Sequence, residues 1–213
     1  MICVSIADLS VSEAIKIIES NELSEVRLDK IKFSSGDIQK MFSLKNKTIA
    51  TYRPTEQVTD DERKKALIDA VNAGASYVDI EVENSDDFKS EIIQAAKLKK
   101  CKTIVSYHNY TKTPVISELE EIMKWCFESK GDIAKIACHV DSVESCSRLL
   151  SLYSYGNPVI SIGMGHEGKI TRIAATLLGA PFTYASIDDS KKTAPGQFDS
   201  EKLKTIIDMI RNS

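Results

Sequence analysis

The chain has 213 residues, 42% of them hydrophobic, and its 28 basic and 31 acidic residues give a formal net charge of −3. A chain of this length can bury a large core, and single α/β barrels commonly run to about 200–250 residues, so we expect a single domain over residues 1–213. The basic residues form no block or arm that would bind DNA or RNA, so we expect no nucleic-acid partner.

Short β-branched runs alternate with stretches of helical periodicity along the whole chain. The predicted strands cover residues 2–7, 24–29, 48–53, 76–82, 102–108, 132–137, 158–164 and 182–187. The predicted helices cover residues 11–20, 35–44, 59–74, 85–100, 116–129, 141–153, 171–179 and 200–212. Eight strands alternating with eight helices predict a single (β/α)8 TIM barrel, and an open doubly wound sheet is the alternative.

A long polar segment, residues 188–200, follows the eighth predicted strand. It is rich in Ser, Lys, Pro and Gly and is long for a connection between a strand and a helix. We interpret it as a flexible lid loop.

The cysteines and the amino terminus bear on the compartment. The five cysteines show no C-x-x-C spacing and mostly lie in apolar runs, which is typical of reduced thiols in a cytoplasm. The first residues lack the pattern of a secretion signal, and no apolar run approaches the ~18 residues of a membrane span. We therefore expect a soluble, cytoplasmic protein without membrane contact.

Charged and polar residues share one face of five neighbouring predicted strands, because alternate strand residues point to the same side. The set comprises Glu25, Arg27, Asp29, Thr51, Arg53, Asp79, Glu81, Ser106, His108 and Lys135. In a barrel the outer strand face packs under helices, so these residues should point inward, where isolated charges are costly unless they are paired. Barrel enzymes place their sites on the strands in this way, so we interpret the set as an active site rather than a structural ion network.

Lys135 lies among Ile and Ala in the run DIAKIA. Burial favours the neutral form of a lysine, and a neutral amine is a nucleophile that forms a Schiff base with a ketone or aldehyde. The competing interpretation is a salt bridge from Lys135 to Asp79 or Glu81. His108, one strand away, could take and give the protons that imine chemistry requires.

The other histidines, His139 just past a strand and His166 in a glycine-rich loop, are interpreted as surface or loop residues. No metal-ligand spacing is present, so we predict no metal and no cofactor. The loop GMGHEGKITR, residues 163–172, runs into a helix and places Arg172 one turn inside it. Such a loop can hold a carboxylate or phosphate, and a tight turn with a surface arginine is the alternative.

Seven segments, in order, resemble motifs of type I 3-dehydroquinate dehydratase, the Schiff-base enzyme of the shikimate pathway. They are SEVRLDK, TIATYRP, VDIEVE, SYHNYTKTP, DIAKIA, GMGHEGKITRI and TAPGQ, and they cover nearly the whole chain. The resemblance implies a hydro-lyase that converts 3-dehydroquinate to 3-dehydroshikimate and water by syn elimination. It also implies a homodimer. The predicted helix over residues 116–129 carries the apolar residues Trp125 and Phe127, which belong either to the core or to a subunit interface.

The resemblance assigns roles to residues of this chain. Lys135 would form an imine with the ketone at C3, and His108 would serve as general acid and base for imine formation, removal of the C2 proton and loss of the C1 hydroxyl. Ring hydroxyls would be held by Glu25, Arg27 and Arg53, with Ser5 a further candidate. The substrate carboxylate would be held by Arg172, Thr193 and Gln197.

The chain departs from the family pattern after the third predicted strand. The family commonly has Glu-Gly-Gly there, whereas this chain has RPTEQVTDDER and offers Glu56 or Gln57 for the auxiliary carboxylate. Thr193 replaces the usual Ser and keeps the hydroxyl. A class I Schiff-base aldolase on a similar barrel and a non-catalytic barrel that binds a small acid are the alternative functions.

Overall fold

Strands and helices alternate along the chain in the order that the sequence predicts. The computed structural model describes residues 1–188, 190–191 and 193–212. The strands are β1 (Ile2–Ile6), β2 (Leu23–Arg27), β3 (Lys47–Thr51), β4 (Tyr77–Glu81), β5 (Lys102–Asn109), β6 (Ile133–His139), β7 (Val159–Met164) and β8 (Thr183–Ser186). The α-helices are α1 (Val11–Ser20), α2 (Ser35–Phe42), α3 (Asp60–Ala73), α4 (Asp86–Lys99), α5 (Ile116–Glu128), α6 (Val143–Ser151), α7 (Lys169–Ala174) and α8 (Ser200–Arg211), and the 3-10 helices are η1 (Leu28–Lys30) and η2 (Leu152–Tyr155).

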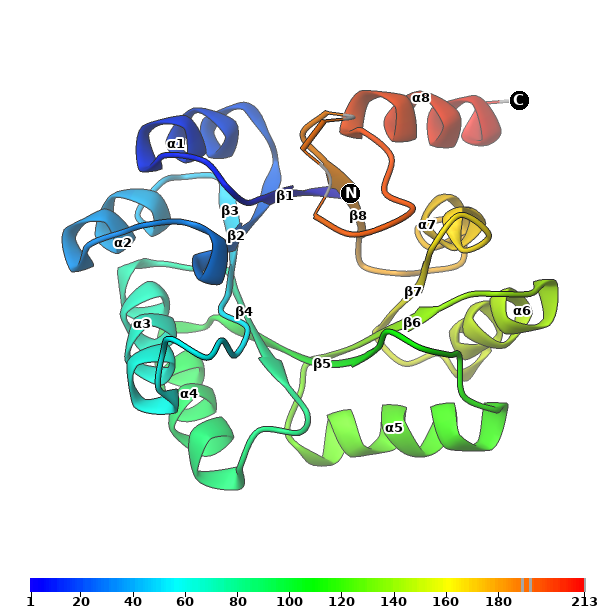
Figure 1. Ribbon diagram of the computed structural model, residues 1–213, viewed down its shortest axis with the longest axis horizontal. Coiled ribbons are helices and arrows are strands. Elements are labelled where there is room, and N and C mark those ends of the chain that lie inside the picture. The colour runs from blue at the N-terminus through cyan, green and yellow to red at the C-terminus, as the bar shows by residue number, and fades with distance from the viewer. Residues whose placement is uncertain (189, 192, 213) are drawn as a thin grey trace.

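The strands form one parallel sheet in the order β7-β6-β5-β4-β3-β2-β1-β8. Because β1 pairs with both β2 and β8, the sheet curls around, and the strands lie at the centre with the helices outside them (Figure 1). No ladder joins β7 to β8 within the described residues, so the barrel is nearly closed. The (β/α)8 TIM barrel is confirmed, and the open doubly wound sheet is wrong.

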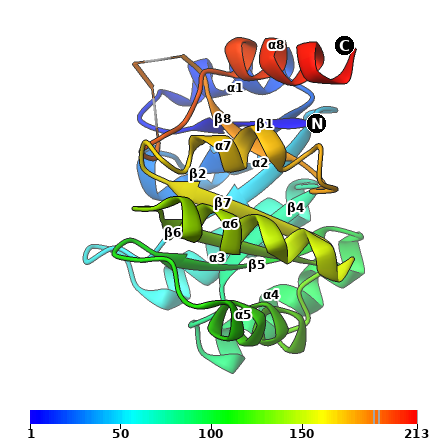
Figure 2. The same cartoon turned by 90° about the vertical axis from the view of Figure 1, so that its right-hand side faces the viewer.

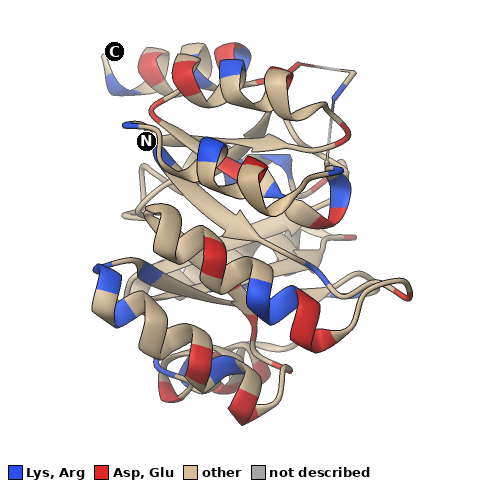
Figure 3. Ribbon diagram, turned by 90° about the vertical axis from the view of Figure 1, so that its left-hand side faces the viewer, with Lys and Arg blue, Asp and Glu red and all other residues tan. Residues whose placement is uncertain are grey.

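The side views show how the helices cover the strands. Helices α5, α6, α7 and α8 follow one another along one side of the barrel (Figure 2). On the opposite side, Lys and Arg are interspersed with Asp and Glu along the helices (Figure 3). None of the helices in the described ranges is long and apolar enough to cross a bilayer.

Local sequence explains where several helices begin. Ser10, Ser34 and Thr59 each precede a helix whose third residue is acidic, and each pair forms a capping box that satisfies free backbone N–H groups. Helix α3 ends at Gly74, whose φ of 122° is accessible to glycine and strained for other residues.

Several predicted boundaries were wrong by two residues or more, and two of these errors have an identifiable reason. The second strand stops at Arg27 rather than Asp29, because the chain turns into η1 and the Asp29 carboxylate accepts hydrogen bonds from Arg27 instead of continuing the strand. Helix α7 ends at Ala174, and the chain continues as turns to Gly179, whose φ is 105°.

The inward side chains form two levels along the barrel axis. The lower level, near the start of each strand, is apolar and comprises Cys3, Leu23, Ile49, Ile104, Ile133, Ile160 and Phe182. The upper level follows two residues later on most strands and contains Ser5, Glu25, Thr51, Asp79, Ser106, Lys135 and Tyr184, all buried. The change from apolar to polar places the charged residues toward the carboxyl ends of the strands, where TIM barrels carry their active sites.

The cysteines and the two aromatic residues of α5 differ in burial. All five cysteines are buried and free, as the sequence predicts. Phe127 packs against the main core cluster, whereas Trp125 on the same helix is 41% exposed.

Candidate active site

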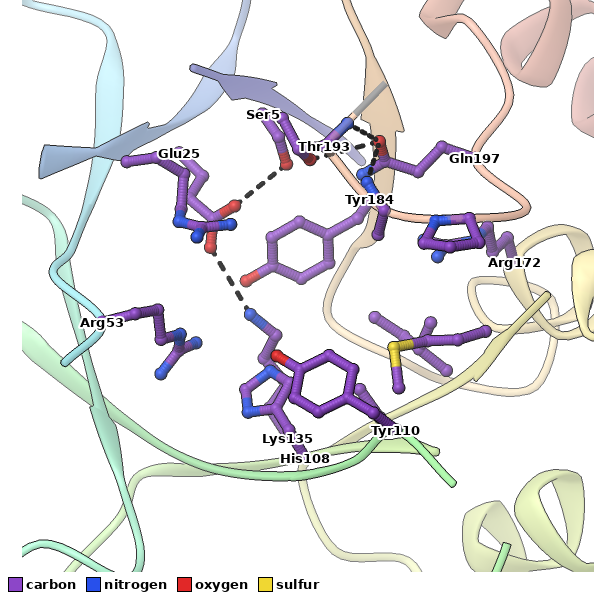
Figure 4. A pocket seen from close by; sticks show the side chains of 16 residues that line it. Ser5, Glu25, Arg53, His108, Tyr110, Lys135, Arg172, Tyr184, Thr193 and Gln197 are labelled. Carbon is purple, nitrogen blue, oxygen red and sulfur yellow. Dashed lines mark hydrogen bonds and ion pairs between the residues drawn. The ribbon is translucent and has the colours of Figure 1, made fainter. Parts of the chain in front are cut away.

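One cavity at the carboxyl ends of the strands brings together all nine predicted site residues. It is lined by Ser5, Glu25, Arg27, Arg53, His108, Lys135, Arg172, Thr193 and Gln197, together with Tyr110, Ala137, Ile162, Met164, Tyr184, Ala194 and Pro195 (Figure 4). The residues come from seven strands or their ends, from α7 and from the segment after β8, so the fold assembles the cavity from the whole length of the chain.

Lys135 projects from β6 into the cavity and is only 5% exposed. Its Nζ lies 2.9 Å from Asp79 Oδ2 and 3.4 Å from Glu25 Oε1. The ring of Tyr184 lies beneath the amine, with its centroid 4.3 Å from Nζ, in the geometry of a cation–π contact. The salt bridge to Asp79 that competed with imine formation is therefore present, and it holds the amine at the centre of the cavity.

Two hydroxyl groups from neighbouring strands fix the orientation of Glu25. Its carboxylate accepts a hydrogen bond from Ser5 Oγ at 2.9 Å and another from Thr51 Oγ1 at 3.0 Å. These contacts, with the ion pair to Lys135, hold a buried carboxylate beside the amine.

Asp79 lies between two cations. Its Oδ1 is 2.9 Å from the Arg53 guanidinium and accepts a hydrogen bond from Ser106 Oγ at 2.6 Å, while Oδ2 faces Lys135. Burial alone would raise the pKa of Asp79, but Arg53 and Lys135, assisted by His108 and the Ser106 hydroxyl, outweigh burial and hold this pKa well below its ordinary value. Asp79 is therefore an anion across the physiological range.

His108 lies near the end of β5, on the strand beside Lys135. Its Nδ1 is 3.8 Å from Glu81 Oε1, and its ring stacks on that of Tyr110 with centroids 6.0 Å apart. Burial, together with the positive charges of Arg53 and Lys135, lowers the pKa of His108 well below its ordinary value. The imidazole is consequently neutral at pH 7 and able to accept a proton.

Arg172 reaches the cavity from α7 and is 1% exposed. Among the described residues its guanidinium forms no ion pair, and Nε has no hydrogen-bond partner. Burial lowers the pKa of Arg172 to about 10, so the side chain stays cationic at neutral pH. The alternative of a surface arginine is wrong, and a buried cation without a partner is suited to binding an anion.

The glycine-rich loop before α7 sets the position of Arg172. Gly163 N donates to Thr171 Oγ1 at 2.8 Å, and a Cβ atom on Gly168 would lie 2.4 Å from the backbone of Gly163. Only glycine permits this approach, so the loop holds the first turn of α7 against the end of β7.

The segment after β8 contributes the remaining wall of the cavity. Gln197 is buried, and its Oε1 accepts hydrogen bonds from Thr193 N at 2.8 Å and Thr193 Oγ1 at 3.2 Å. Pro195 O accepts a hydrogen bond from Gly165 N at 3.3 Å, which joins this segment to the glycine-rich loop. Asp189 and Lys192 of the predicted lid lie outside the described residues, and movement of residues 188–200 as a lid stays a prediction.

Several expectations about other residues need correction. Glu56 and Gln57 are both exposed and neither lines the cavity, so neither can serve as the auxiliary carboxylate. The carboxylate nearest His108 is Glu81, on β4. His139 is the last residue of β6 and is partly buried, rather than lying past the strand, whereas the side chain of His166 is 81% exposed.

Seven lining residues were missing from the predicted site, and the largest side chains among them are Tyr110, Met164 and Tyr184. Strand parity places Met164 and Tyr184 on the inward face, but an aromatic or apolar residue at that position is usually a core residue, so the sequence offers no signal for a role in the site. Within the described ranges no cluster of His, Cys, Asp and Glu could hold a metal ion.

The fold and the cavity define a (β/α)8-barrel enzyme with a buried amine, a neutral imidazole and an unpaired cation in one site. A family model described as Type I 3-dehydroquinase matches residues 2–213, and the chain belongs to that family. It is a hydro-lyase with 3-dehydroquinate dehydratase activity, and this excludes the aldolase and the non-catalytic barrel.

Individual relatives agree with the family assignment. The 3-dehydroquinate dehydratase of Methanococcus maripaludis strain C7 is 34% identical over 99% of this chain and 100% of its own length. That of Methanocaldococcus jannaschii is 35% identical over 97% of each chain. The crystal structure of the enzyme from Aquifex aeolicus superposes with a TM-score of 0.84 at 28% identity, covering 98% of each chain.

Proposed function

We propose that the chain converts 3-dehydroquinate to 3-dehydroshikimate and water through a Schiff base on Lys135, as a step of the shikimate pathway of aromatic amino acid biosynthesis. The observation that supports this most directly is the placement of the buried Lys135 amine in one cavity with His108 and with Arg172, which forms no ion pair among the described residues. A nucleophile, a proton carrier and an anion site are the three parts that the reaction requires.

Binding comes first in this proposal. The substrate carboxylate pairs with Arg172, with the Thr193 and Gln197 side chains beside it, and fills the anion site. Ser5, Glu25, Arg27 and Arg53, which line the same cavity, hold the ring hydroxyls. This arrangement places the C3 ketone near Lys135.

Imine formation follows. Lys135 passes one proton from its ammonium to the neutral imidazole of His108, and the resulting amine attacks C3. The carbonyl oxygen takes up that proton and a second one from the nitrogen, and it leaves as water. His108 supplies and removes the protons that this exchange needs. The nitrogen of the resulting iminium is cationic and withdraws electrons from C2.

Elimination and release complete the cycle. His108 takes the C2 proton, the electron pair moves toward the iminium, and the C1 hydroxyl departs with a proton from His108 as water. One imidazole serving both steps acts from one side of the ring, which accounts for a syn elimination. Water then hydrolyses the imine, releases the product and restores Lys135.

Trapping the intermediate tests the proposal. Borohydride added with dehydroquinate should reduce the imine and leave a mass adduct on the peptide that contains Lys135. Lys89→Met is the matched control, because Lys89 is also 5% exposed but lies outside the cavity, where it donates to Val82 O. An adduct that persists in Lys135→Ala, or turnover near the wild-type rate in that variant, would contradict the proposal.

We further propose that residues 1–213 form one catalytic domain that acts in the cytoplasm as a homodimer. Family membership supports this, and the exposed Trp125 on α5 offers apolar surface for a subunit contact. Sedimentation of the purified chain tests the dimer, and a monomer at micromolar concentration would contradict it.

A further inference from the structure

Tyr184 is a buried residue of the cavity that no step above uses. It lies on β8 in the same polar level as Lys135 and is 3% exposed. Its ring forms the surface beneath Lys135 Nζ, at 4.3 Å from the ring centroid. In Figure 4 its hydroxyl points toward the space between Glu25, Arg53 and Lys135.

The hydroxyl of Tyr184 has no hydrogen-bond partner among the described residues. A buried hydroxyl without a partner lowers stability, because it loses its hydrogen bonds to water on folding and gains none. A phenylalanine would give the same apolar contacts without this loss. No described protein group pairs with the hydroxyl, which points to a partner that arrives with the substrate.

Packing holds the ring of Tyr184 in place from below. Phe182 contacts it edge-on with centroids 5.6 Å apart, and Tyr77 contacts Phe182 in the same way at 5.5 Å. The three aromatic residues form a row of edge-on contacts that extends from the lower level of the barrel to the Lys135 amine. Because the ring cannot swing away, the hydroxyl keeps a fixed position relative to Lys135.

The protonation state of the phenol is suited to donation. Burial, with the negative charge of Glu25 nearby, raises the pKa of Tyr184 well above its ordinary value. The phenol therefore keeps its proton at neutral pH and presents an O–H donor to the cavity. Glu25 and Asp79 accept hydrogen bonds from Ser5, Thr51 and Ser106 rather than from Tyr184. Among the described residues the phenol therefore donates to no carboxylate, and its O–H group can donate to a bound substrate.

We propose, building on imine formation at Lys135, that Tyr184 is a further catalytic residue whose hydroxyl donates a hydrogen bond to the ketone oxygen of the substrate. The ketone carbon must approach Nζ, and Nζ lies over the ring that carries the hydroxyl, so the ketone oxygen enters the space that this hydroxyl faces. Negative charge develops on that oxygen as the carbon–nitrogen bond forms. A fixed donor aimed at developing charge lowers the barrier to attack.

Tyr184→Phe tests the proposal because it removes the hydroxyl alone and keeps the ring beneath Nζ. The measurement is the rate at which the borohydride-trapped adduct forms with saturating dehydroquinate, followed by rapid quenching and mass spectrometry. We expect the adduct to form on the order of tenfold more slowly or worse. The melting temperature should equal or exceed that of the wild type, because an unpaired buried hydroxyl is lost.

Tyr77→Phe is the matched control. It also removes one phenolic hydroxyl from the same row of edge-on aromatic contacts, but Tyr77 does not line the cavity. The rate of adduct formation in Tyr77→Phe should match the wild type.

The outcomes separate this proposal from the one on which it builds. If Tyr184→Phe forms the adduct at the wild-type rate, or loses stability and affinity without a change in that rate, the catalytic role of the hydroxyl is wrong and the Schiff base at Lys135 stands. If the wild type forms no adduct while it still dehydrates the substrate, the Schiff base itself is wrong, and the role of Tyr184 in its formation is wrong with it.

Discussion

Lys135 Nζ lies 2.9 Å from Asp79 Oδ2, and the other oxygen of the same carboxylate lies 2.9 Å from the Arg53 guanidinium. One buried anion thus lies between two buried cations. The side chain of Asp79 is fully buried, so its charge is compensated by these partners and by Ser106 rather than by water. Asp79 therefore links the stability of the barrel to the charge of the Lys135 amine.

Asp79→Asn should destabilise the protein by about 3–5 kcal/mol, because it leaves Arg53 and Lys135 buried without their shared anion. Urea unfolding at pH 7 measures the change. Asp69→Asn is the control, since Asp69 forms an ion pair with the exposed Lys65 on the surface and should contribute no more than about 1 kcal/mol.

The pH dependence of stability tests the same contact. Burial would raise the pKa of Asp79, but the two cations outweigh it, and the folded-state pKa lies well below the unfolded value of about 4. The stability that Asp79 contributes is complete above pH ~4 and is lost as the pH falls toward the folded-state pKa. The difference in unfolding free energy between wild type and Asp79→Asn should therefore narrow below pH ~4, and a constant difference would contradict this account.

His108→Ala should lower kcat by about 10²–10⁴-fold, the usual contribution of a general acid–base group. Since burial and the charges of Arg53 and Lys135 lower the pKa of His108, the neutral base persists as the pH falls through 6.5. The acid limb of the wild-type kcat/KM profile should accordingly lie below pH 6.5. His166→Ala changes an exposed histidine and should leave both kcat and the profile unaltered.

Arg172→Gln should raise KM by about 10- to 100-fold, which corresponds to the loss of charge-assisted hydrogen bonds to the substrate carboxylate. Stability should be unchanged or increased, because the guanidinium is buried without an ion-pair partner in the described part of the chain. Arg211→Gln removes an exposed arginine and serves as the control. A large loss of stability in Arg172→Gln, with KM unchanged, would show a structural rather than a binding role.

Gly196→Ala should displace the segment that carries Thr193 and Gln197, because its new Cβ would lie 2.2 Å from Gly165 O. KM should rise at least severalfold. Gly156→Ala is the matched control, since Gly156 also has a positive φ, 71° against 80° for Gly196, but its Cβ would meet nothing within 4 Å. Equal kinetic effects in the two variants would mean that backbone strain, rather than contact with the glycine-rich loop, is responsible.

Much of the fold and the site could be predicted because strands follow a period of two. Parity alone turned Glu25, Asp79 and Lys135 inward, and each lies in the upper level of the barrel. Parity fails where the chain turns into η1, which explains why Asp29 was misplaced in a strand that ends at Arg27.

Other features depend on packing between segments far apart in the sequence. The burial of Arg172 results from a close approach of Gly163 and Gly168 that no local pattern predicts. Tyr184 resembles an ordinary core aromatic in the sequence. In the structure it is distinguished by its contact with the Lys135 amine and by a hydroxyl without a partner among the described residues. Unsatisfied hydrogen bonds are a property of the folded chain and have no counterpart in composition or periodicity.

The apolar lower level of the barrel limits how small molecules can enter and leave the cavity. Leu23, Ile49, Ile104, Ile133 and Ile160 fill the interior below Lys135 and are fully buried or nearly so. Because these side chains are apolar and closely packed, we expect that water released by the dehydration does not leave through the lower level toward the amino-terminal ends of the strands. The substrate must therefore enter through the opening between the carboxyl ends of the strands and the segment that bears Thr193 and Gln197. The released water and the product must leave through the same opening, one after the other.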